Sequence, residues 1–128
     1  MGASFSVVQL TEDEQGASYF DHAETALDLQ DFAPPASPFF VSPTQQASSY
    51  VVVRFPAGWV GQLHRSPARQ MLFGLSGVIK VTAGNGETCS IGPGQALLMG
   101  DTRGSGHMTE VVSAVPCDAI IIRLAPSP

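Results

Sequence analysis

The feature that most constrains the fold is a regular succession of short strand-like runs in the second half of the chain. Each run is rich in apolar residues and is bounded by Gly, Pro, Asn or Asp, the pattern of strands separated by tight turns. Asn85 and Gly86 lie between two of these runs and predict a two-stranded hairpin. Evenly spaced short strands predict an all-β sandwich or barrel. The predicted strands are 50–56, 70–75, 78–83, 87–91, 95–99, 106–112 and 118–124.

Composition favours the same class. The 128 residues include 13 Gly and 10 Pro, and Lys80 is the only lysine. Hydrophobic residues make up 44% of the chain and charged residues only 13%, which is typical of a compact domain and not of a disordered segment. A chain of this length forms one domain that can bury a core.

Charge and patterning exclude several classes of partner. The formal net charge of -5 leaves no basic face for a phosphate backbone, so we expect no nucleic-acid partner. No apolar run approaches the roughly 20 residues of a membrane span. The N-terminus lacks a basic segment followed by an apolar one, so we expect a cytoplasmic protein. Cys89 and Cys117 show no CxxC spacing and are expected to be reduced, with a disulfide left open.

The first 49 residues are predicted to form an arm that precedes a barrel formed by residues 50–128. Residues 6–10 predict a short strand, and residues 11–16 predict a turn because Gly16 follows the Thr11–Glu14 capping spacing at once. Residues 21–49 are rich in Pro and Ser and are predicted to form an extended loop. We expect this arm to pack on the barrel or on a partner subunit.

The stretch GWVGQLHRSPARQ, residues 58–70, places a histidine among small and apolar residues. Together with Gly77, the residues Gly58, His64 and Gln70 resemble the first sequence motif of the cupins. The chain departs from that motif at two ligand positions, because Ser66 replaces a second histidine and Gln70 replaces a glutamate.

The stretch GPGQALLMGDTRGSGH, which ends at His107, resembles the second cupin motif. Within the cupins it is similar to a bacterial subgroup of small single-domain proteins. Gly94, Gly104 and His107 fall on motif positions, whereas Gly100 stands where the motif has Pro and Val111 where it has Asn. Two extra residues precede Gly104. The resemblance implies a double-stranded β-helix, that is, a jelly-roll barrel whose mouth holds the functional site.

In such a barrel the side chains alternate between the lumen and the exterior. His64, Gln70 and Leu72 should therefore face the lumen, Phe73 should face away, and His107 should meet them across the mouth. Each histidine could instead be a buried core residue bonded to the backbone. Catalytic roles are assigned to His64, His107 and Gln70: histidine for acid-base chemistry and the Gln70 amide for stabilising an oxyanion.

A metal site is the alternative use of the same residues. His64 and His107 could bind Fe, Ni, Zn or Mn, with Gln70 or Asp101 completing the site. A neutral amide is a poor metal ligand compared with a carboxylate. Asp101 lies in a Gly-rich turn, and a role in forming that turn is the simpler interpretation of this residue. No cofactor is therefore favoured.

Substrate contacts are expected from one cation and several apolar side chains. Arg54 interrupts an apolar strand and either anchors an anion in the lumen or lies on the outer face. Trp59, Leu72, Leu97 and Met99 either line a pocket or pack in the core.

Two function classes remain open at this stage. The first is a metal-independent isomerase, epimerase or cyclase that acts on an apolar, carbonyl-bearing, natural-product-like small molecule. The second is a non-catalytic ligand-binding or sensing module, and a two-histidine dioxygenase is a third alternative. Cupins of this size commonly pair, so the resemblance also implies a homodimer.

Overall fold

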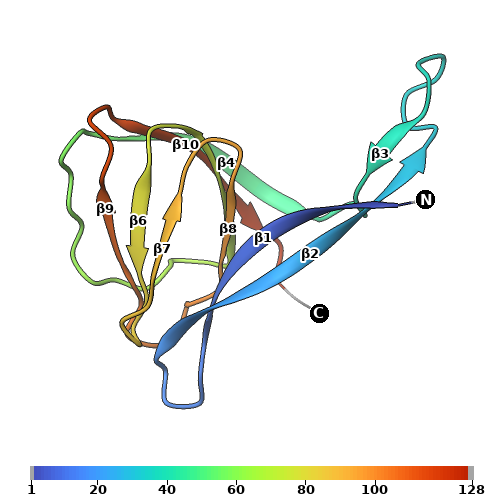
Figure 1. Ribbon diagram of the computed structural model, residues 1–128. Helices are drawn as coiled ribbons and strands as arrows, with labels where there is room; N and C mark the ends of the chain where they lie inside the picture. Colours follow the sequence, from blue (N-terminus) through green and yellow to red (C-terminus); the bar gives the residue numbers. More distant parts are fainter. Residues whose placement is uncertain (1, 127–128) are drawn as a thin grey trace.

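The computed structural model describes residues 2–126 and contains ten strands and no helix within that range (Figure 1). Among these residues, therefore, no helix has the length and hydropathy to cross a membrane. The strands are β1 (Ala3–Glu12), β2 (Ser18–Gln30), β3 (Phe39–Val41), β4 (Ala47–Phe55), β5 (Gln70–Ser76), β6 (Ile79–Thr82), β7 (Thr88–Ile91), β8 (Ala96–Met99), β9 (Met108–Val111) and β10 (Cys117–Leu124).

The strands form two facing sheets. A seven-stranded sheet has the order β3-β2-β1-β8-β5-β10-β4, and a three-stranded sheet has the order β7-β6-β9. Val60 and His64 form isolated bridges to Glu110 and His107, so the segment between them lies beside β9 as a fourth strand position. The orders β4-β10-β5-β8 and (60–64)-β9-β6-β7 make a two-sheet jelly roll. The predicted all-β jelly-roll barrel is confirmed.

The core lies between the two sheets and follows the two-residue period of the strands. Leu97 is 1% exposed and faces inward, whereas its neighbour Leu98 lies on the outer face. β5 behaves likewise, with Leu72 in the core and Phe73 outside, as the alternation predicted. The other core residues include Leu10, Ile79, Val81, Ile91, Val111 and Ala119.

The predicted hairpin at Asn85-Gly86 is present and joins β6 to β7. Gly86 has a φ of 91°, a conformation that favours glycine, and its N–H donates to the carbonyl of Ala83 at 3.0 Å. The Asn85 side chain adds a hydrogen bond from the backbone N–H of Glu87 at 3.0 Å.

The prediction of an extended loop over residues 21–49 is wrong for much of that segment. β2 pairs with β1 along ten residues, from Ser18 opposite Glu12 to Leu27 opposite Ala3, and β3 pairs with the end of β2. The turn between β1 and β2 was predicted and is present, with the Asp13 carboxylate accepting the N–H groups of Gln15 and Ala17 at 2.9 Å.

The paired strands β2 and β3, with the first half of β1, project from the barrel as a ribbon, which we call the arm (Figure 1). The remainder of β1 is part of the barrel, because Val8 to Leu10 pair in parallel with Leu97 to Met99 of β8. The arm is thus a continuation of the barrel's own sheet.

Candidate functional site

A cavity of about 160 Å³ lies between the two sheets, at the end of the barrel where His64 is exposed. Its volume is similar to that of a roughly 150 Å³ protein cavity that admits benzene, so one six-membered ring fits inside. Four of its lining residues are polar: His64, Gln70, His107 and Thr109. The apolar lining residues are Phe55, Trp59, Leu72, Ile79, Val81, Leu97, Met99 and Ile121.

His107 is held by a buried carboxylate. Its Nδ1 lies 2.5 Å from Oδ2 of Asp101, and the two side chains are 4% and 0% exposed. An ionised carboxylate only accepts hydrogen bonds, so Nδ1 carries the proton. The neutral ring then presents an unprotonated Nε2, because only one ring nitrogen is protonated in that state. Because Nδ1 is bonded to Asp101, Nε2 is the nitrogen of His107 that is left for the cavity that the ring lines.

Ser66 supports this pair from behind. Its hydroxyl donates to Oδ1 of Asp101 at 2.8 Å, and its backbone N–H donates to the Asp101 carbonyl at 3.0 Å. Ser66 is 2% exposed and lines no part of the cavity. The motif has a second histidine ligand where this chain has Ser66. In the fold, Ser66 instead holds Asp101 in place.

His64 lies next to His107 on the neighbouring strand position. The backbones of the two residues exchange hydrogen bonds of 3.0 and 2.8 Å, and the ring centroids are 4.8 Å apart. Nδ1 of His64 lies 2.9 Å from the carbonyl of Gln62, which can only accept, so this ring also presents Nε2. Both histidines therefore stand on one wall of the cavity.

Gly106 makes the contact between these two strand positions possible. It has a φ of +87°, and a Cβ at this position would lie 2.0 Å from the carbonyl oxygen of His64. Any side chain at residue 106 would push the two histidine-bearing segments apart. Glycine here therefore fixes the spacing of the two rings.

The remaining predicted pocket residues, apart from Arg54, line the cavity. Gln70 enters from β5, and its amide nitrogen lies 4.0 Å from the Met99 sulfur. Trp59 stacks on Phe55 with ring centroids 5.0 Å apart, and Leu72 and Leu97 also reach the core. The site thus combines a polar end with apolar walls.

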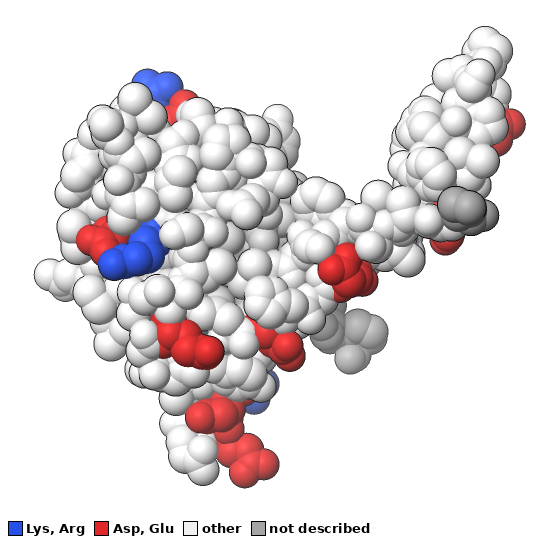
Figure 2. Space-filling model, in the orientation of Figure 1, with Lys and Arg blue, Asp and Glu red and all other residues white. Residues whose placement is uncertain are grey.

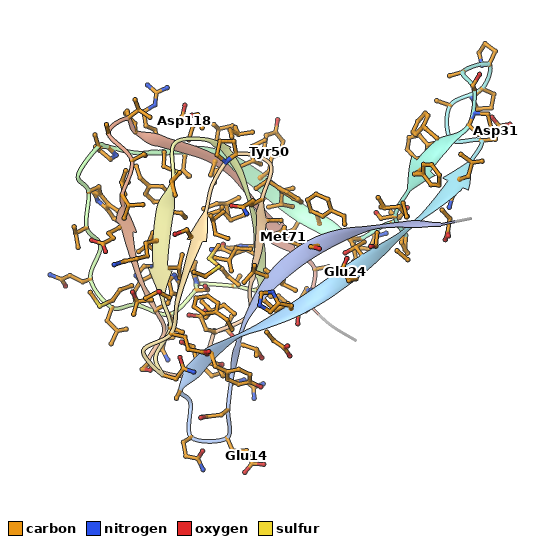
Figure 3. The ribbon with its side chains drawn as sticks, in the orientation of Figure 1. Glu14, Glu24, Asp31, Tyr50, Met71 and Asp118 are labelled. Atoms are coloured by element: carbon orange, nitrogen blue, oxygen red, sulfur yellow. The ribbon has the colours of Figure 1, made fainter. Side chains whose placement is uncertain are left out.

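Arg54 is not part of the cavity, which corrects the lumen-facing alternative. Its guanidinium binds the Asp118 carboxylate through two hydrogen bonds of 2.7 and 2.9 Å on the outside of the barrel, where Figure 3 labels Asp118. The hydrogen bonds and charge of this pair raise the pKa of Arg54 and lower the pKa of Asp118. Its neighbours Val53 and Phe55 take the inward face of β4 instead.

Sequence reasoning missed a different arginine. Arg123 of β10 is directly opposite Gln70 in the antiparallel pairing, so the two side chains share a face of the sheet. Gln70 lines the cavity and Arg123 is exposed, which puts a cation on the rim of the mouth. The period-two pattern of β10, in which Ile121 is inward and Ile122 outward, was the signal that could have found it.

The donor set does not fit a tightly held catalytic metal. Within residues 2–126 no group of three His, Cys, Asp or Glu side chains is arranged to hold a metal ion. Asp101 binds Nδ1 of His107, on the side of the ring away from Nε2, so it is not available as a ligand beside that nitrogen. Two imidazoles and a neutral amide remain, without the carboxylate or third histidine of known catalytic sites.

The cysteines take no part in the site. Cys89 and Cys117 are both free thiols, as expected, and burial raises the pKa of each. Neither lines the cavity between the sheets.

Comparisons with known proteins find similarity of structure alone. No protein-family model matches the chain, and no curated protein sequence matches it. A conserved protein of unknown function from Streptococcus pyogenes (SPY1581) has 21% sequence identity and a TM-score of 0.47, over 68% of this chain and 72% of that chain. The Cnp3 cupin domain of Schizosaccharomyces pombe has 15% identity and a TM-score of 0.48, over 97% and 84%.

At these scores neither protein indicates what this chain binds or catalyses. The assignment of the fold rests on the strand order of the two facing sheets. In the barrel part, β4-β10-β5-β8 of the seven-stranded sheet face the segment 60–64 with β9-β6-β7 around a small cavity, which is the arrangement of the jelly-roll barrels, which include the cupins. The chain is an all-β protein with a cupin-like fold.

Proposed function

We propose that the protein is a small-molecule enzyme that moves protons on an apolar, carbonyl-bearing substrate, with His107 as general base. The observation that supports this proposal most is the buried Asp101–His107 pair at 2.5 Å. A carboxylate in this position fixes the tautomer and stabilises the imidazolium that forms when Nε2 takes a proton. A histidine that served only the core would not need a buried charge.

The proposed reaction begins with a C–H bond next to the substrate carbonyl. His107 Nε2 takes the proton, and the electron pair moves onto the carbonyl oxygen as an enolate. The Gln70 amide N–H groups are the donors available to that oxygen. His64, when protonated, returns a proton to another carbon. The cycle closes when the proton held by His107 passes to His64, directly or through solvent at the exposed His64.

The position of both rings on one wall narrows the reaction type. Epimerisation by two bases needs an acid and a base on opposite faces of the substrate. His64 and His107 have ring centroids only 4.8 Å apart on neighbouring strand positions, so both reach the same face. We therefore favour a one-face proton shift, such as double-bond isomerisation or cyclisation, over epimerisation.

Arg123 extends the proposal to the substrate's polar end. A cation on the rim beside Gln70 suits a carboxylate or phenolate that stays near solvent while the ring enters the cavity. Arg123→Gln should raise KM for an acidic substrate and leave kcat nearly unchanged, because this contact is made equally in the ground and transition states.

The proposal is tested with a panel of small cyclic and aromatic ketones, including 3-cyclohexen-1-one, incubated with protein in D₂O. NMR detects deuterium at the carbon that receives the returned proton, and ultraviolet absorbance detects the conjugated isomer. His107→Gln and Asp101→Asn should each lower the rate about 100-fold or more. His22→Gln is the matched control, because His22 is exposed on β2 and lines neither the cavity nor the mouth.

Unchanged turnover in folded His107→Gln protein would refute the acid-base role. The second candidate, a non-catalytic binding module, is favoured by the predominantly apolar lining of the cavity. It predicts that a ketone shifts the NMR signals of cavity residues without any deuterium uptake, so the same samples distinguish the two functions.

A further inference from the structure

A second, larger hollow lies on the outer side of the seven-stranded sheet, at the root of the arm; we call it the groove. Its volume is about 380 Å³, and volumes of about 300 Å³ or more are typical of small-molecule sites. Figure 3 labels Met71, which lies on its floor. Among the described residues, the groove shares no lining residue with the cavity between the sheets. Its apolar lining residues are Val7, Ala23, Ala47, Met71, Phe73, Leu98, Ile122 and Leu124.

One cation stands in this apolar lining. Arg69 is the one charged residue among the described residues that line the groove, and it is half-buried. No ion pair within residues 2–126 involves Arg69. A guanidinium keeps its charge at physiological pH, and partial burial removes part of its hydration. An anion in the groove would therefore be stabilised by Arg69.

The acidic side chains of the arm do not supply that anion. Glu24 and Asp28 alternate with Thr25, which lines the groove, so they point to the opposite face of β2. On that face the Glu24 carboxylate accepts the Ser6 hydroxyl at 2.7 Å. Figure 2 shows acidic side chains at the surface along the arm, and Figure 3 labels Glu24. Asp21 shares the face of Thr25 but does not line the groove.

The cation and the apolar floor follow one another in a line. Arg69 directly precedes β5, and Met71 and Phe73 come next on the same outer face, with about 7 Å between successive residues. The backbone of Arg69 is held in place, because its carbonyl accepts the N–H of Leu124 at 3.0 Å. This arrangement suits a linear molecule with an anionic head at Arg69 and an apolar tail along the floor.

We propose that the groove binds a free fatty acid of about eight carbons, with its carboxylate on Arg69 and its chain over Met71 and Phe73. The size fits, because a cavity of only about 150 Å³ admits benzene. A guanidinium and a carboxylate match through two parallel hydrogen bonds. The remaining polar lining residues are two glutamines and a threonine, which are neutral, so the site suits a monoanion better than a phosphate dianion. The groove is separate from the proposed catalytic cavity, and this inference does not depend on the proposed function.

The test is a titration of the full chain with sodium octanoate, followed by NMR of ¹³C-methyl-labelled methionines. Three methionines report on different places: Met71 lines the groove, Met99 lines the cavity between the sheets, and Met108 is exposed on β9. Octanoate should shift the Met71 signal and leave the signals of Met99 and Met108 unchanged. The unchanged signals also show that the fold is intact.

The affinity should depend on the chain length and on the charge of the ligand. Hexanoate should bind roughly 15-fold more weakly than octanoate, because each buried methylene tightens binding about fourfold. Octan-1-ol should bind about 10-fold more weakly, because it lacks the charge-assisted hydrogen bonds. Arg69→Gln should weaken octanoate binding about 10-fold and change octan-1-ol binding less than about threefold.

Arg65→Gln is the matched control. Arg65 carries the same charge four residues earlier, but it is exposed and lines neither the groove nor the cavity between the sheets. Its affinity for octanoate should stay within about twofold of wild type, because an exposed charge outside the site is screened by solvent and salt.

Three results would overturn the proposal. A shift of Met99 in place of Met71 would assign the fatty acid to the barrel cavity. Equal weakening by Arg69→Gln and Arg65→Gln would contradict the role of Arg69 as the carboxylate anchor. A Met71 signal that does not shift at millimolar octanoate would mean that the groove binds no fatty acid.

Discussion

Oδ2 of Asp101 lies 2.5 Å from Nδ1 of His107, and both side chains are buried. Asp101 also accepts the Ser66 hydroxyl, so the carboxylate is bonded on both oxygens. The fold thereby places one oriented histidine at the edge of an apolar cavity.

Ser66→Ala should lower the free energy of unfolding by about 2 kcal/mol, because a hydrogen bond to a buried charged group is lost. Chemical denaturation at pH 7 measures the change. Ser48→Ala is the control, since Ser48 is exposed on β4, and it should stay within about 0.5 kcal/mol of wild type. Equal stability of the two variants would mean that the Ser66 hydroxyl does not support Asp101.

Gly106→Ala should destabilise the protein by about 3 kcal/mol or more and change the NMR signals of both cavity histidines. The substitution combines a positive φ with a clash against the His64 carbonyl. Gly94→Ala separates the two causes, because Gly94 has a φ of +80° but nothing within 4 Å of its Cβ position. That control should cost only about 1–2 kcal/mol. A Gly106→Ala cost no larger than that of Gly94→Ala would contradict the close approach.

Arg54→Met should change how stability depends on pH. Hydrogen bonds from Arg54 lower the pKa of Asp118 in the folded protein. The pair therefore stabilises the fold above the ordinary Asp pKa of about 3.9, and this contribution is lost as pH falls through the lower folded value. The Tm difference between wild type and Arg54→Met should be largest near pH 6 and should shrink below pH 4. A difference independent of pH would argue against the ion pair.

Metal content is expected to be low. Protein purified without an affinity tag should contain well under one equivalent of Fe, Ni, Zn or Mn per chain, because two imidazoles and an amide are a weak donor set. Inductively coupled plasma mass spectrometry measures this directly. A stoichiometric metal that is lost in His64→Ala would favour the dioxygenase alternative over metal-independent proton transfer.

The sequence predicted those parts of the fold in which a strand has one buried face. The alternation from Gln70 through Leu72 to Phe73 was assigned correctly, because the period of two distinguishes core from exterior. It failed for β2, because Ala23, Thr25 and Leu27 alternate with exposed residues but are only partly buried, so the contrast between the two faces is weaker than in β5. Pro and Ser residues after Gln30 then extended the loop assignment too far.

The lining of the candidate site was predicted in part, for a related reason. His64, Gln70 and His107 were found through spacing that resembles a known family. Asp101 was interpreted as a turn residue, because nothing in the local sequence indicates that its carboxylate bonds a histidine six residues further along the chain. Arg54 could not be assigned to a face, since Val52 and Val53 are equally apolar and only the pairing with Asp118 decides.

The most direct test of the account is the tautomer of each histidine, read from long-range ¹H–¹⁵N correlation spectra near pH 8. The chain has only three histidines, so His22 is an exposed internal reference. His64 and His107 should both carry the proton on Nδ1, and Asp101→Asn should move it to Nε2 in His107 alone, because an Asn amide can donate to Nδ1. Two results would contradict the proposed role of His107 as general base: a wild-type His107 protonated on Nε2, or a His107 tautomer that does not change in Asp101→Asn.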